Sequence, residues 1–547
     1  MATRLAITVS GAVSLGSYEA GVLYEVLYAV GQHNQNPQTA EDEKIYIDVL
    51  TGASAGGMSV ALAASKLLYD ADALSDPYQN TLYQAWVVDI DVDALLTFQK
   101  EEAPDCSIFS SDLISTLAAR YLSARYGNGV TPAQNMHPAI GPDRSLRLGL
   151  ALSNLNGIDY GRTTLDGGEF IYSRFQDEYC RTLTETDDNQ SAWQPIQQAA
   201  VACGAFPFAF RPQDFQRTRA EFANPDLVTD NLGPDPLTFT YTDGGVFQNE
   251  PLGLAKNFVD DIDNHLNSDS RAYLFVCPDP KMSNTDRKFA AKLANFRTMF
   301  GTLALAILYE SRFQDWIRAE KVNQQINLFN TRANQLHTLV KSGVLPAQAI
   351  DPVASVLLKQ LLPAESDLAD ARTQLRKQFS AEYEDLVNTT SLGQDGAEAW
   401  LDAILVLELA ADLHEKDEMH IYTVTASDQE LAGAQLFAFL GFFDQDYRQH
   451  DYDIGRTKAQ QLLTSAIGRE NGPLPVLRYT PQPIRPIDSR LAGTTISDAP
   501  IEKRKAMRDR LKNRVDIILK EANLPVILRE PLELFYVNGK ISEFLGL

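Results

Sequence analysis

The first 70 residues alternate between short apolar runs and stretches in which apolar residues recur every three or four positions. The runs at 5–9 and 46–50 have the length of buried strands, and small residues follow each of them. The stretches at 16–30 and 56–68 carry apolar residues at helical spacing. This order of strand, loop, helix, strand, sharp turn and helix predicts a parallel sheet with crossover helices, and therefore an α/β fold.

The same two patterns continue through the first half of the chain. We predict strands at 146–152, 169–175, 237–242 and 272–277, and helices at 114–126 and 192–203. An Asp-Gly pair at 166–167 separates two strand-prone runs and favours a hairpin turn between them.

The character of the sequence changes at about residue 284. Long helical patterns with few glycines predict a helical insertion up to residue 415, with helices at 289–329, 368–387 and 397–413. The α/β pattern then returns with a strand at 420–425 and helices at 431–443 and 455–467. An irregular linker is expected at 471–500, followed by an amphipathic helix from residue 502 to 522 and two short strand-like runs. We therefore expect four parts, with boundaries 1–283, 284–415, 416–470 and 471–547.

Composition narrows the functional classes. The 547 residues include 44% hydrophobic and 22% charged residues, which is typical of a globular protein. The net charge of −24 repels phosphate backbones and argues against nucleic-acid partners. The sequence contains no stretch of 18 uncharged apolar residues, so we predict no membrane-spanning helix. The four cysteines (Cys106, Cys180, Cys203 and Cys277) form no CxxC pair, which indicates free thiols and a cytoplasmic location.

The strongest chemical signal is a G-x-S-x-G motif at residues 52–56. It follows a predicted strand and precedes a predicted helix, the context of a nucleophile elbow. Gly52 and Gly56 let the backbone turn sharply there, and the turn presents the hydroxyl of Ser54 at the carboxyl edge of the sheet. The alternative is a glycine-rich turn in which Ser54 only caps the helix.

A serine nucleophile needs a base, and two kinds of residue are candidates. Among the seven histidines, none has the local signature of a catalytic base, and His450 is the nearest by chain order. Asp243 instead lies at the end of a predicted strand, and Gly244 and Gly245 allow a tight turn beside it. Its carboxylate can accept the serine proton directly. Asp166 begins a second Asp-Gly-Gly, which we interpret as the hairpin turn.

Three segments together resemble the patatin-like phospholipases, a family of serine lipid acyl hydrolases. They are the loop and helix at 11–23, the elbow at 52–56, and the aspartate motif at 243–251, and they occur in the family's order. Residues 202–212 also resemble the segment before the aspartate motif, and 431–463 are similar to the closing part of larger bacterial members. The resemblance implies a three-layer α/β/α domain over residues 1–283, with a mostly parallel central sheet.

The resemblance also implies an activity. A Ser54–Asp243 dyad would cleave carboxylic esters of lipids through an acyl-enzyme, as a phospholipase A or esterase, with no cofactor and no metal. The oxyanion hole would comprise Gly11, Ala12, Val13 and Gly16, with the N–H of Ala55 as a further donor. The family's loop usually reads G-G-G-x-R/K-G, so two glycines and the basic residue are absent here. A positive φ at Val13 would be strained, because its side chain is β-branched.

That altered loop motivates a rival interpretation, a protein of the same fold that binds lipid or a partner without turnover. Acyl transfer to an acceptor other than water is a third. Residues 502–521 carry a charge of +4 and an apolar stripe at Met507, Leu511, Val515 and Ile518. This helix either docks on a membrane surface, which would place the protein peripherally on lipid, or packs on the acidic body of the protein.

Overall fold

The computed structural model describes residues 2–98, 107–123, 135–163, 166, 168–222, 226–228, 232–263, 270–278, 290, 299, 302–303, 306, 310, 313–362, 365–389, 392–411, 413, 418–465, 472–521, 541–542 and 545–547. The chain divides into two compact units. Met1–Ala255, Ser270–Gln314 and Ile421–Leu547 form the first, which we call the α/β unit. Lys256–Asp269 and Asp315–His420 form the second, the helical unit.

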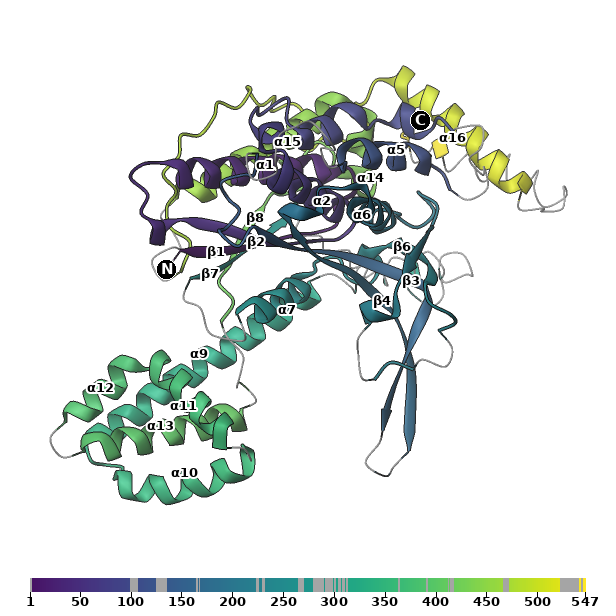
Figure 1. Ribbon diagram of the computed structural model, residues 1–547. Helices are drawn as coiled ribbons and strands as arrows, with labels where there is room; N and C mark the ends of the chain where they lie inside the picture. Colours follow the sequence, from purple (N-terminus) through teal and green to yellow (C-terminus); the bar gives the residue numbers. More distant parts are fainter. Residues whose placement is uncertain are drawn as a thin grey trace. The chain divides into compact units, whose positions relative to one another are not determined.

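A mixed sheet forms the centre of the α/β unit (Figure 1). Within the described residues its strands run in the order β5-β6-β3-β2-β1-β7-β8, and β4 pairs with β3. The strands are β1 (Thr3–Val9), β2 (Ile45–Gly52), β3 (Ser145–Thr163), β4 (Glu169–Thr184), β5 (Gln213–Arg217), β6 (Leu237–Asp243), β7 (Arg271–Cys277) and β8 (Ile421–Thr425). The pairs joining β3, β2, β1, β7 and β8 are parallel, whereas β4, β6 and β5 pair antiparallel.

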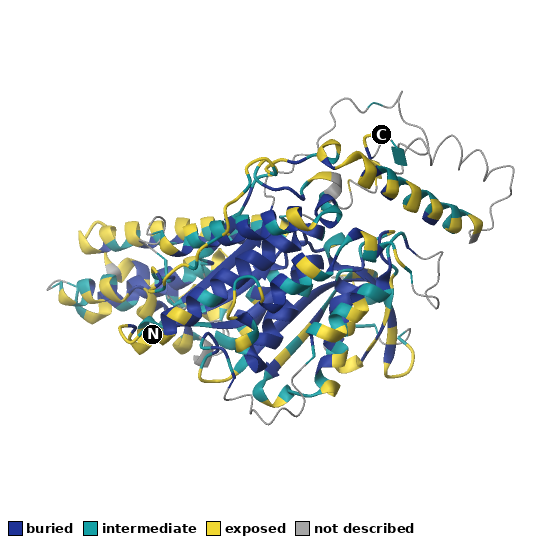
Figure 2. Ribbon diagram, turned by 90° about the horizontal axis from the view of Figure 1, so that it is seen from above, coloured by how far each residue is buried: buried dark blue, intermediate teal, exposed yellow. Residues whose placement is uncertain are grey.

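Helices lie on both faces of this sheet, which makes the unit a three-layer α/β/α structure (Figure 1). One layer contains α1 (Gly16–Gln35), α2 (Ser54–Tyr69), α5 (Ser111–Tyr121), α6 (Gln190–Cys203) and α15 (Gln445–Thr464). On the other side the chain enters α7 (Leu252–Asp263), whose first turn is buried. The core is continuous through the sheet and the first layer, as the dark blue centre of Figure 2 shows. Strand β7 is buried along its whole length, as expected of a parallel strand covered on both faces.

Helices α1 and α15 cross at a contact between two glycines. A Cβ atom on Gly21 would lie 2.1 Å from the carbonyl oxygen of Tyr452, and one on Gly455 would lie 2.2 Å from that of Tyr18. Glycine at both positions lets the two backbones touch. Next to the crossing, the fully buried Arg456 and Glu25 form an ion pair with N and O 3.0 Å apart. The late helix α15 is therefore part of the same core as α1.

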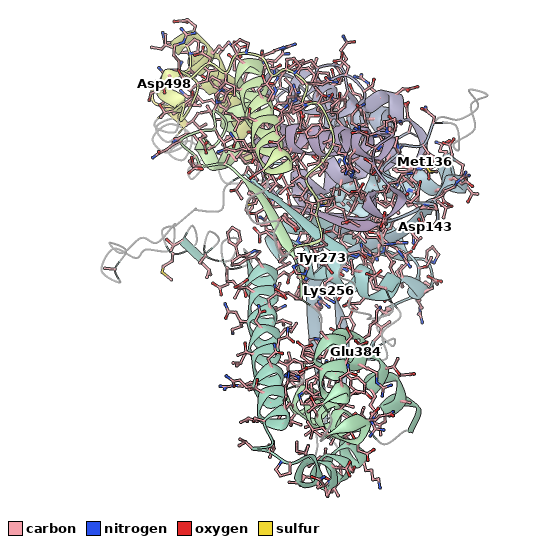
Figure 3. The ribbon with its side chains drawn as sticks, turned by 90° about the vertical axis from the view of Figure 1, so that its left-hand side faces the viewer. Met136, Asp143, Lys256, Tyr273, Glu384 and Asp498 are labelled. Carbon is pink, nitrogen blue, oxygen red and sulfur yellow. The ribbon has the colours of Figure 1, made fainter. Side chains whose placement is uncertain are left out.

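The helical unit has a hydrophobic core of its own, centred on Trp400 of α13. Its helices are α9 (Gln314–Lys341), α10 (Ala347–Leu361), α11 (Glu365–Gln378), α12 (Ser380–Asn388) and α13 (Gly393–Ala410). Its helices carry charged side chains, among them Glu384 of α12 (Figure 3). Figure 3 also labels Tyr273 of β7 in the α/β unit. Arg372 and Asp402 form an ion pair that links α11 to α13, with N and O 2.5 Å apart.

The predicted fold class is confirmed, and several predicted elements need correction. Residues 431–443 are not one helix, because only α14 (Gln435–Ala438) and a 3₁₀ turn (Leu440–Phe443) are helical. Helix α15 begins ten residues earlier than predicted, and the predicted helix 368–387 is divided at Phe379. Strands β3 and β4 extend well beyond their predicted lengths, while β5 and α10 were not predicted. Most of 289–313 and of the last 25 residues lies outside the described residues.

Candidate active site

The chain turns sharply between β2 and α2. Ser54 has a φ of 51°, a left-handed conformation that is uncommon for a residue with a side chain. A Cβ atom on Gly52 would lie 2.6 Å from the backbone of Gly56, and one on Gly56 would lie 2.3 Å from the carbonyl oxygen of Ser10. Both glycines of the motif are therefore required by close packing of the turn against β1. The cap position of α2 is Ala53, so the interpretation of Ser54 as a helix cap is wrong.

Strand β6 brings Asp243 to Ser54. The hydroxyl of Ser54 donates a hydrogen bond to Oδ2 of Asp243 at 2.5 Å, and both side chains are buried. The other carboxylate oxygen accepts the N–H of Gly245 at 2.7 Å. A Cβ atom on Gly244 would lie 2.0 Å from the carbonyl oxygen of Ala151 in β3, so only glycine lets the chain turn there.

Burial raises the pKa of Asp243 to about 7, and the hydrogen bonds from Ser54 and Gly245 offset part of that effect. The carboxyl is thus poised to exchange a proton near neutral pH, which is the range in which a general base is most effective. A second buried group lies under the turn, where Sγ of Cys203 is 3.8 Å from the carbonyl oxygen of Ser54. Burial raises the pKa of Cys203, so its thiol stays neutral.

The loop between β1 and α1 lies against the serine. A Cβ atom on Gly11 would be 3.0 Å from Cβ of Ser54 and 2.3 Å from Oδ1 of Asn249. The N–H of Gly11 donates to the carbonyl oxygen of Asn249 at 3.0 Å, and the N–H of Gly16 is also occupied, by carbonyl oxygens of the turn before it. Val13 has a φ of 53°. This conformation is strained for a β-branched residue.

Three backbone N–H groups near Ser54 have no hydrogen-bond acceptor within the described residues: those of Ala12, Val13 and Ala55. Ala55 lies in the first turn of α2, where the N–H groups lack intrahelical partners and the helix dipole is positive. Donors of this kind suit a developing oxyanion. Of the predicted donors, Gly11 and Gly16 therefore serve packing in this structure, while Ala12, Val13 and Ala55 keep their N–H groups available.

Comparison with known proteins addresses the family directly. The family model for patatin-like phospholipase matches residues 7–256, a range that includes the elbow, the loop and the aspartate motif. Residues 7–256 form a patatin-like phospholipase domain. The chain is also 22% identical to "Uncharacterized protein y4iI" of Sinorhizobium fredii, and the match covers 46% of this chain and 45% of that protein. The match therefore spans less than half of that relative's length.

Neither of the other candidate residues is hydrogen-bonded to Ser54 in the described structure, where Ser54 donates to Asp243. Asp166 is exposed in the connection between β3 and β4, as the hairpin interpretation predicts. His450 is buried in α15 with Nε2 2.9 Å from the carbonyl oxygen of Glu430. Within the described residues, no group of three or more His, Cys, Asp or Glu side chains could hold a metal ion. None of the described helices is both long enough and apolar enough to cross a membrane.

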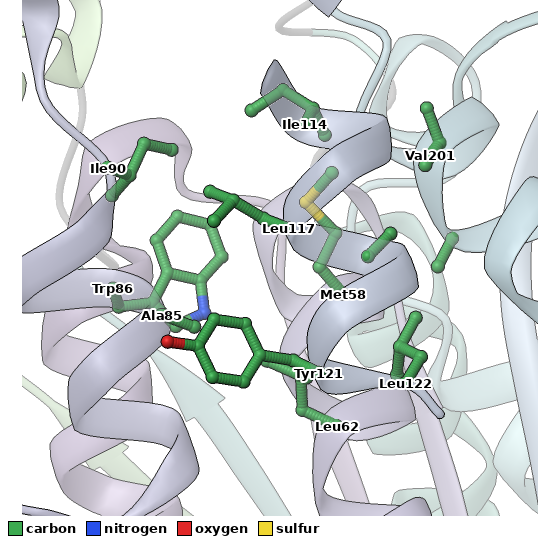
Figure 4. Close-up of a pocket in the computed structure, with 12 residues that line it drawn as sticks. Met58, Leu62, Ala85, Trp86, Ile90, Ile114, Leu117, Tyr121, Leu122 and Val201 are labelled. Carbon is green, nitrogen blue, oxygen red and sulfur yellow. The ribbon is translucent and has the colours of Figure 1, made fainter. Parts of the chain in front are cut away.

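An apolar pocket of about 60 Å³ lies along the helix that follows Ser54 (Figure 4). Met58 and Leu62 line it, four and eight positions after Ser54 and hence on the same helical face. Trp86 lines this pocket and also packs against the loop between β1 and α1, because a Cβ atom on Gly16 would be 2.6 Å from its ring. The pocket is also lined by Ala85, Ile90, Ile114, Leu117, Ala118, Tyr121, Leu122, Ala200 and Val201.

Two residues of the site were missed as contributors by the sequence analysis. Ser14 makes hydrogen bonds to the segment at 438–441, and Asn249 bridges the oxyanion loop to the aspartate motif. Asn249 was visible in the family motif, although nothing indicated its contact with Gly11. For Ser14 no local signal existed, because its partners follow the helical unit in the chain.

Proposed function

We propose that the protein is a lipid acyl hydrolase that cleaves carboxylic esters through Ser54 and Asp243. The hydrogen bond from Ser54 to Asp243, inside a patatin-like phospholipase domain, carries this proposal. The family implies a lipid substrate. The dyad, the acyl-enzyme and the ester chemistry are our assignment.

Acylation begins with transfer of one proton. As Oγ of Ser54 attacks the ester carbonyl carbon, its proton passes to Oδ2 of Asp243, 2.5 Å away. The tetrahedral intermediate collapses when the carbonyl re-forms and the alcohol leaves, taking the proton from Asp243. The N–H of Gly245 holds the other carboxylate oxygen, which keeps Oδ2 directed at Ser54.

The negative charge on the substrate oxygen meets backbone donors. We assign this stabilisation to the N–H groups of Ala12, Val13 and Ala55, in a loop whose Gly11 packs against Ser54. The loop therefore works without the glycines and the basic residue that the family usually has. Because the loop lacks those glycines, a β-branched residue, Val13, adopts the strained left-handed conformation.

Water then completes the reaction. Asp243, again deprotonated, accepts a proton from a water molecule that attacks the acyl-enzyme, and Ser54 leaves with that proton. The products are a carboxylic acid and the alcohol released in the first step. If an alcohol or a lysolipid replaced water, the same dyad would perform acyl transfer.

Labelling with a fluorophosphonate probe tests the nucleophile. We expect wild-type protein to be labelled, Ser54→Ala to be unlabelled, and Asp243→Asn to be labelled at least about 100-fold more slowly. Ser59→Ala is the matched control, because Ser59 is a buried serine on the same helix but one turn and a half away. Loss of labelling in that control, or labelling of Ser54→Ala, would contradict the assignment.

Product analysis separates hydrolysis from its rivals. We expect free fatty acid from a phospholipid or monoester substrate, with Ser54-dependent release that added lysolipid or alcohol does not divert. A transesterified product would favour the acyltransferase. Absence of both labelling and turnover would favour a protein that only binds lipid.

A further inference from the structure

A second apolar pocket is lined by Phe206 and Phe439, which adjoin residues that support the candidate site. It has a volume of about 310 Å³, at the lower end of the range of ligand sites in proteins. Its lining is almost entirely apolar and comprises Val92, Ile108, Phe109, Phe206, Pro207, Phe208, Ala209, Phe439, Phe443, Met507, Leu511, Val515 and Ile541. Such a lining suits a hydrocarbon chain.

Two residues of this lining adjoin residues that hydrogen-bond to Asp243 and to Ser14. Phe206 follows Ala205, whose carbonyl oxygen accepts the N–H of Asp243 at 3.0 Å. Phe439 follows Ala438, whose carbonyl oxygen accepts the hydroxyl of Ser14 in the oxyanion loop. The rings of Phe206 and Phe439 are in edge-on contact, with centroids 5.8 Å apart. The lining of the pocket thus includes one residue next to the support of Asp243 and one next to the support of the loop that carries Ser14.

Helix α16 (Ile501–Glu521) also lines the pocket. Met507, Leu511 and Val515 lie four positions apart on one helical face, and all three line the pocket. The apolar stripe of this basic helix is therefore turned toward the protein. Arg514 of the same helix also contacts the protein. It donates a hydrogen bond to the carbonyl oxygen of Ser107 at 2.9 Å and lies over the ring of Phe98.

Further contacts hold α16 in place. Lys503 pairs with Asp444 and Arg510 pairs with Asp93, each with N and O 2.6 Å apart. Arg504 is buried and donates to backbone carbonyl oxygens at 499, 545 and 546. The structure thus favours the interpretation of the basic helix as one packed on the body of the protein, because four of its eight cations (Lys503, Arg504, Arg510 and Arg514) contact residues outside the helix.

We propose that this pocket binds the acyl chain of the ester that Ser54 attacks, and that α16 sets the length of chain it accepts. The inference rests on the proposed hydrolase function. Helix α16 lies outside the matched range 7–256, so this selectivity would come from a part of the chain that the patatin-like domain does not contain.

Two observations favour this pocket over the one beside Met58. Its volume is about five times as large, 310 against 60 Å³. In addition, Phe208 in its lining has a φ of 67° and Ala438, next to Phe439, has a φ of 62°. Left-handed conformations at residues with side chains cluster where a ligand site over-determines the backbone.

The test compares esters of different chain length. Leu511→Trp fills the pocket from α16, and we expect kcat/KM for a 4-nitrophenyl palmitate to fall at least tenfold while that for the butyrate stays within twofold. Asn513→Trp is the matched control, because Asn513 is exposed on the same helix and outside the lining. Leu511→Phe provides a smaller substitution if the Trp variant melts at a lower temperature than wild type.

Leu117→Trp, which fills the pocket beside Met58, completes the design. If Leu117→Trp rather than Leu511→Trp removed the long-chain ester selectively, or if Leu511→Trp lowered both esters equally, the inference would be wrong. Displacement of a fluorescent fatty acid from the purified protein gives a readout without turnover. If no ester were hydrolysed in a Ser54-dependent way, the proposed function would fail, and weaker fatty-acid binding in Leu511→Trp alone would still support the acyl pocket.

Discussion

The hydroxyl of Ser14 donates a hydrogen bond to the carbonyl oxygen of Ala438, 424 residues later in the chain. It also accepts the N–H of Gly441 at 3.1 Å. These two bonds fix the residue that follows the strained Val13, and thereby the loop that we assign to the oxyanion. The loop thus depends on a segment beyond the patatin-like domain.

Removing this contact should impair the reaction more than the fold. We expect Ser14→Ala to lower kcat by about tenfold with KM nearly unchanged, because a loss of about 1.4 kcal/mol in the transition state corresponds to that factor. Steady-state kinetics with a soluble ester would measure the effect. Ser17→Ala is the control, since its hydroxyl bonds only to the carbonyl oxygen of Ser14 in the described structure. An equal loss of kcat there would contradict a role of the Ser14 bonds.

The strain at Val13 predicts an inverted order of stability. Val13→Gly should unfold at a higher temperature than Val13→Ala, by the equivalent of about 1 kcal/mol, because glycine accepts a positive φ. At Val26, inside α1, the order should be the usual one, with the glycine variant about 1 kcal/mol less stable than the alanine variant. Thermal melts of the four variants test both statements. The same order at both positions would show that Val13 is not strained.

The raised pKa of Asp243 predicts the pH dependence of activity. The carboxylate accepts the serine proton only when it is ionised, so kcat/KM should rise from pH 5 to 8 with an apparent pKa near 7. Initial rates on an uncharged soluble ester would measure the profile. A rate already constant from pH 5 upward would contradict the assignment of a carboxyl with this pKa as base.

The same group makes a prediction about folding. Because the pKa of Asp243 is about 7 in the folded chain and 3.8 in ordinary surroundings, the folded state binds more protons between these pH values. Titration of Asp243 therefore lowers the free energy of unfolding as the pH rises from about 4 to 7. Asp243→Asn should be more stable than wild type at pH 8 by up to about 4 kcal/mol, and the difference should vanish near pH 4. Chemical denaturation at the two pH values would measure it.

The crossing of α1 and α15 should tolerate no side chain. Gly455→Ala places a methyl group 2.2 Å from the carbonyl oxygen of Tyr18, so the helices must separate, and we expect a loss of about 3 kcal/mol or more. Gly31→Ala is the comparison on α1, because its new methyl group would meet only the ring of His137. That ring lies 2.8 Å from the new methyl group and must shift, so we expect a loss of stability, but a smaller one than at Gly455, where the obstacle is backbone. Equal losses of stability for the two variants in urea denaturation would contradict a close backbone contact at the crossing.

The N-terminal half of the fold was predictable because its local patterns agree with its tertiary environment. Strands β1, β2 and β7 are apolar runs and are buried, and Ser54 lies between two glycines that the turn requires. The order of motifs then pointed to Asp243 before any distance was known.

The segment from 431 to 464 was harder to predict for a physical reason. Its first part has helical spacing, but the side chain of Asp451 accepts the N–H groups of Ala432 and Gly433, which holds that backbone outside a helix. The first half of α15 looks too polar for a core, yet Arg448 and Asp451 are buried there. Arg448 donates to the carbonyl oxygens of Val87, 361 residues earlier in the chain, and of Gly441 and Phe442, while Asp451 accepts the two N–H groups named above. The polar pattern of the helix alone does not indicate these partners.

Synthesis of the chain from its N-terminus gives the glycine crossing a further consequence. Strand β8 and helix α15 leave the ribosome only after residues 256–420, so α1 is complete long before the helix that covers it. Until then Glu25 lacks Arg456, and the edge of β7 that pairs with β8 is open. Contacts of such long sequence separation slow folding and leave apolar surface exposed to aggregation. A fragment ending at residue 256 would lack β7 as well as β8 and α15, so expression trials of this protein should retain residues 271–277 and 421–464.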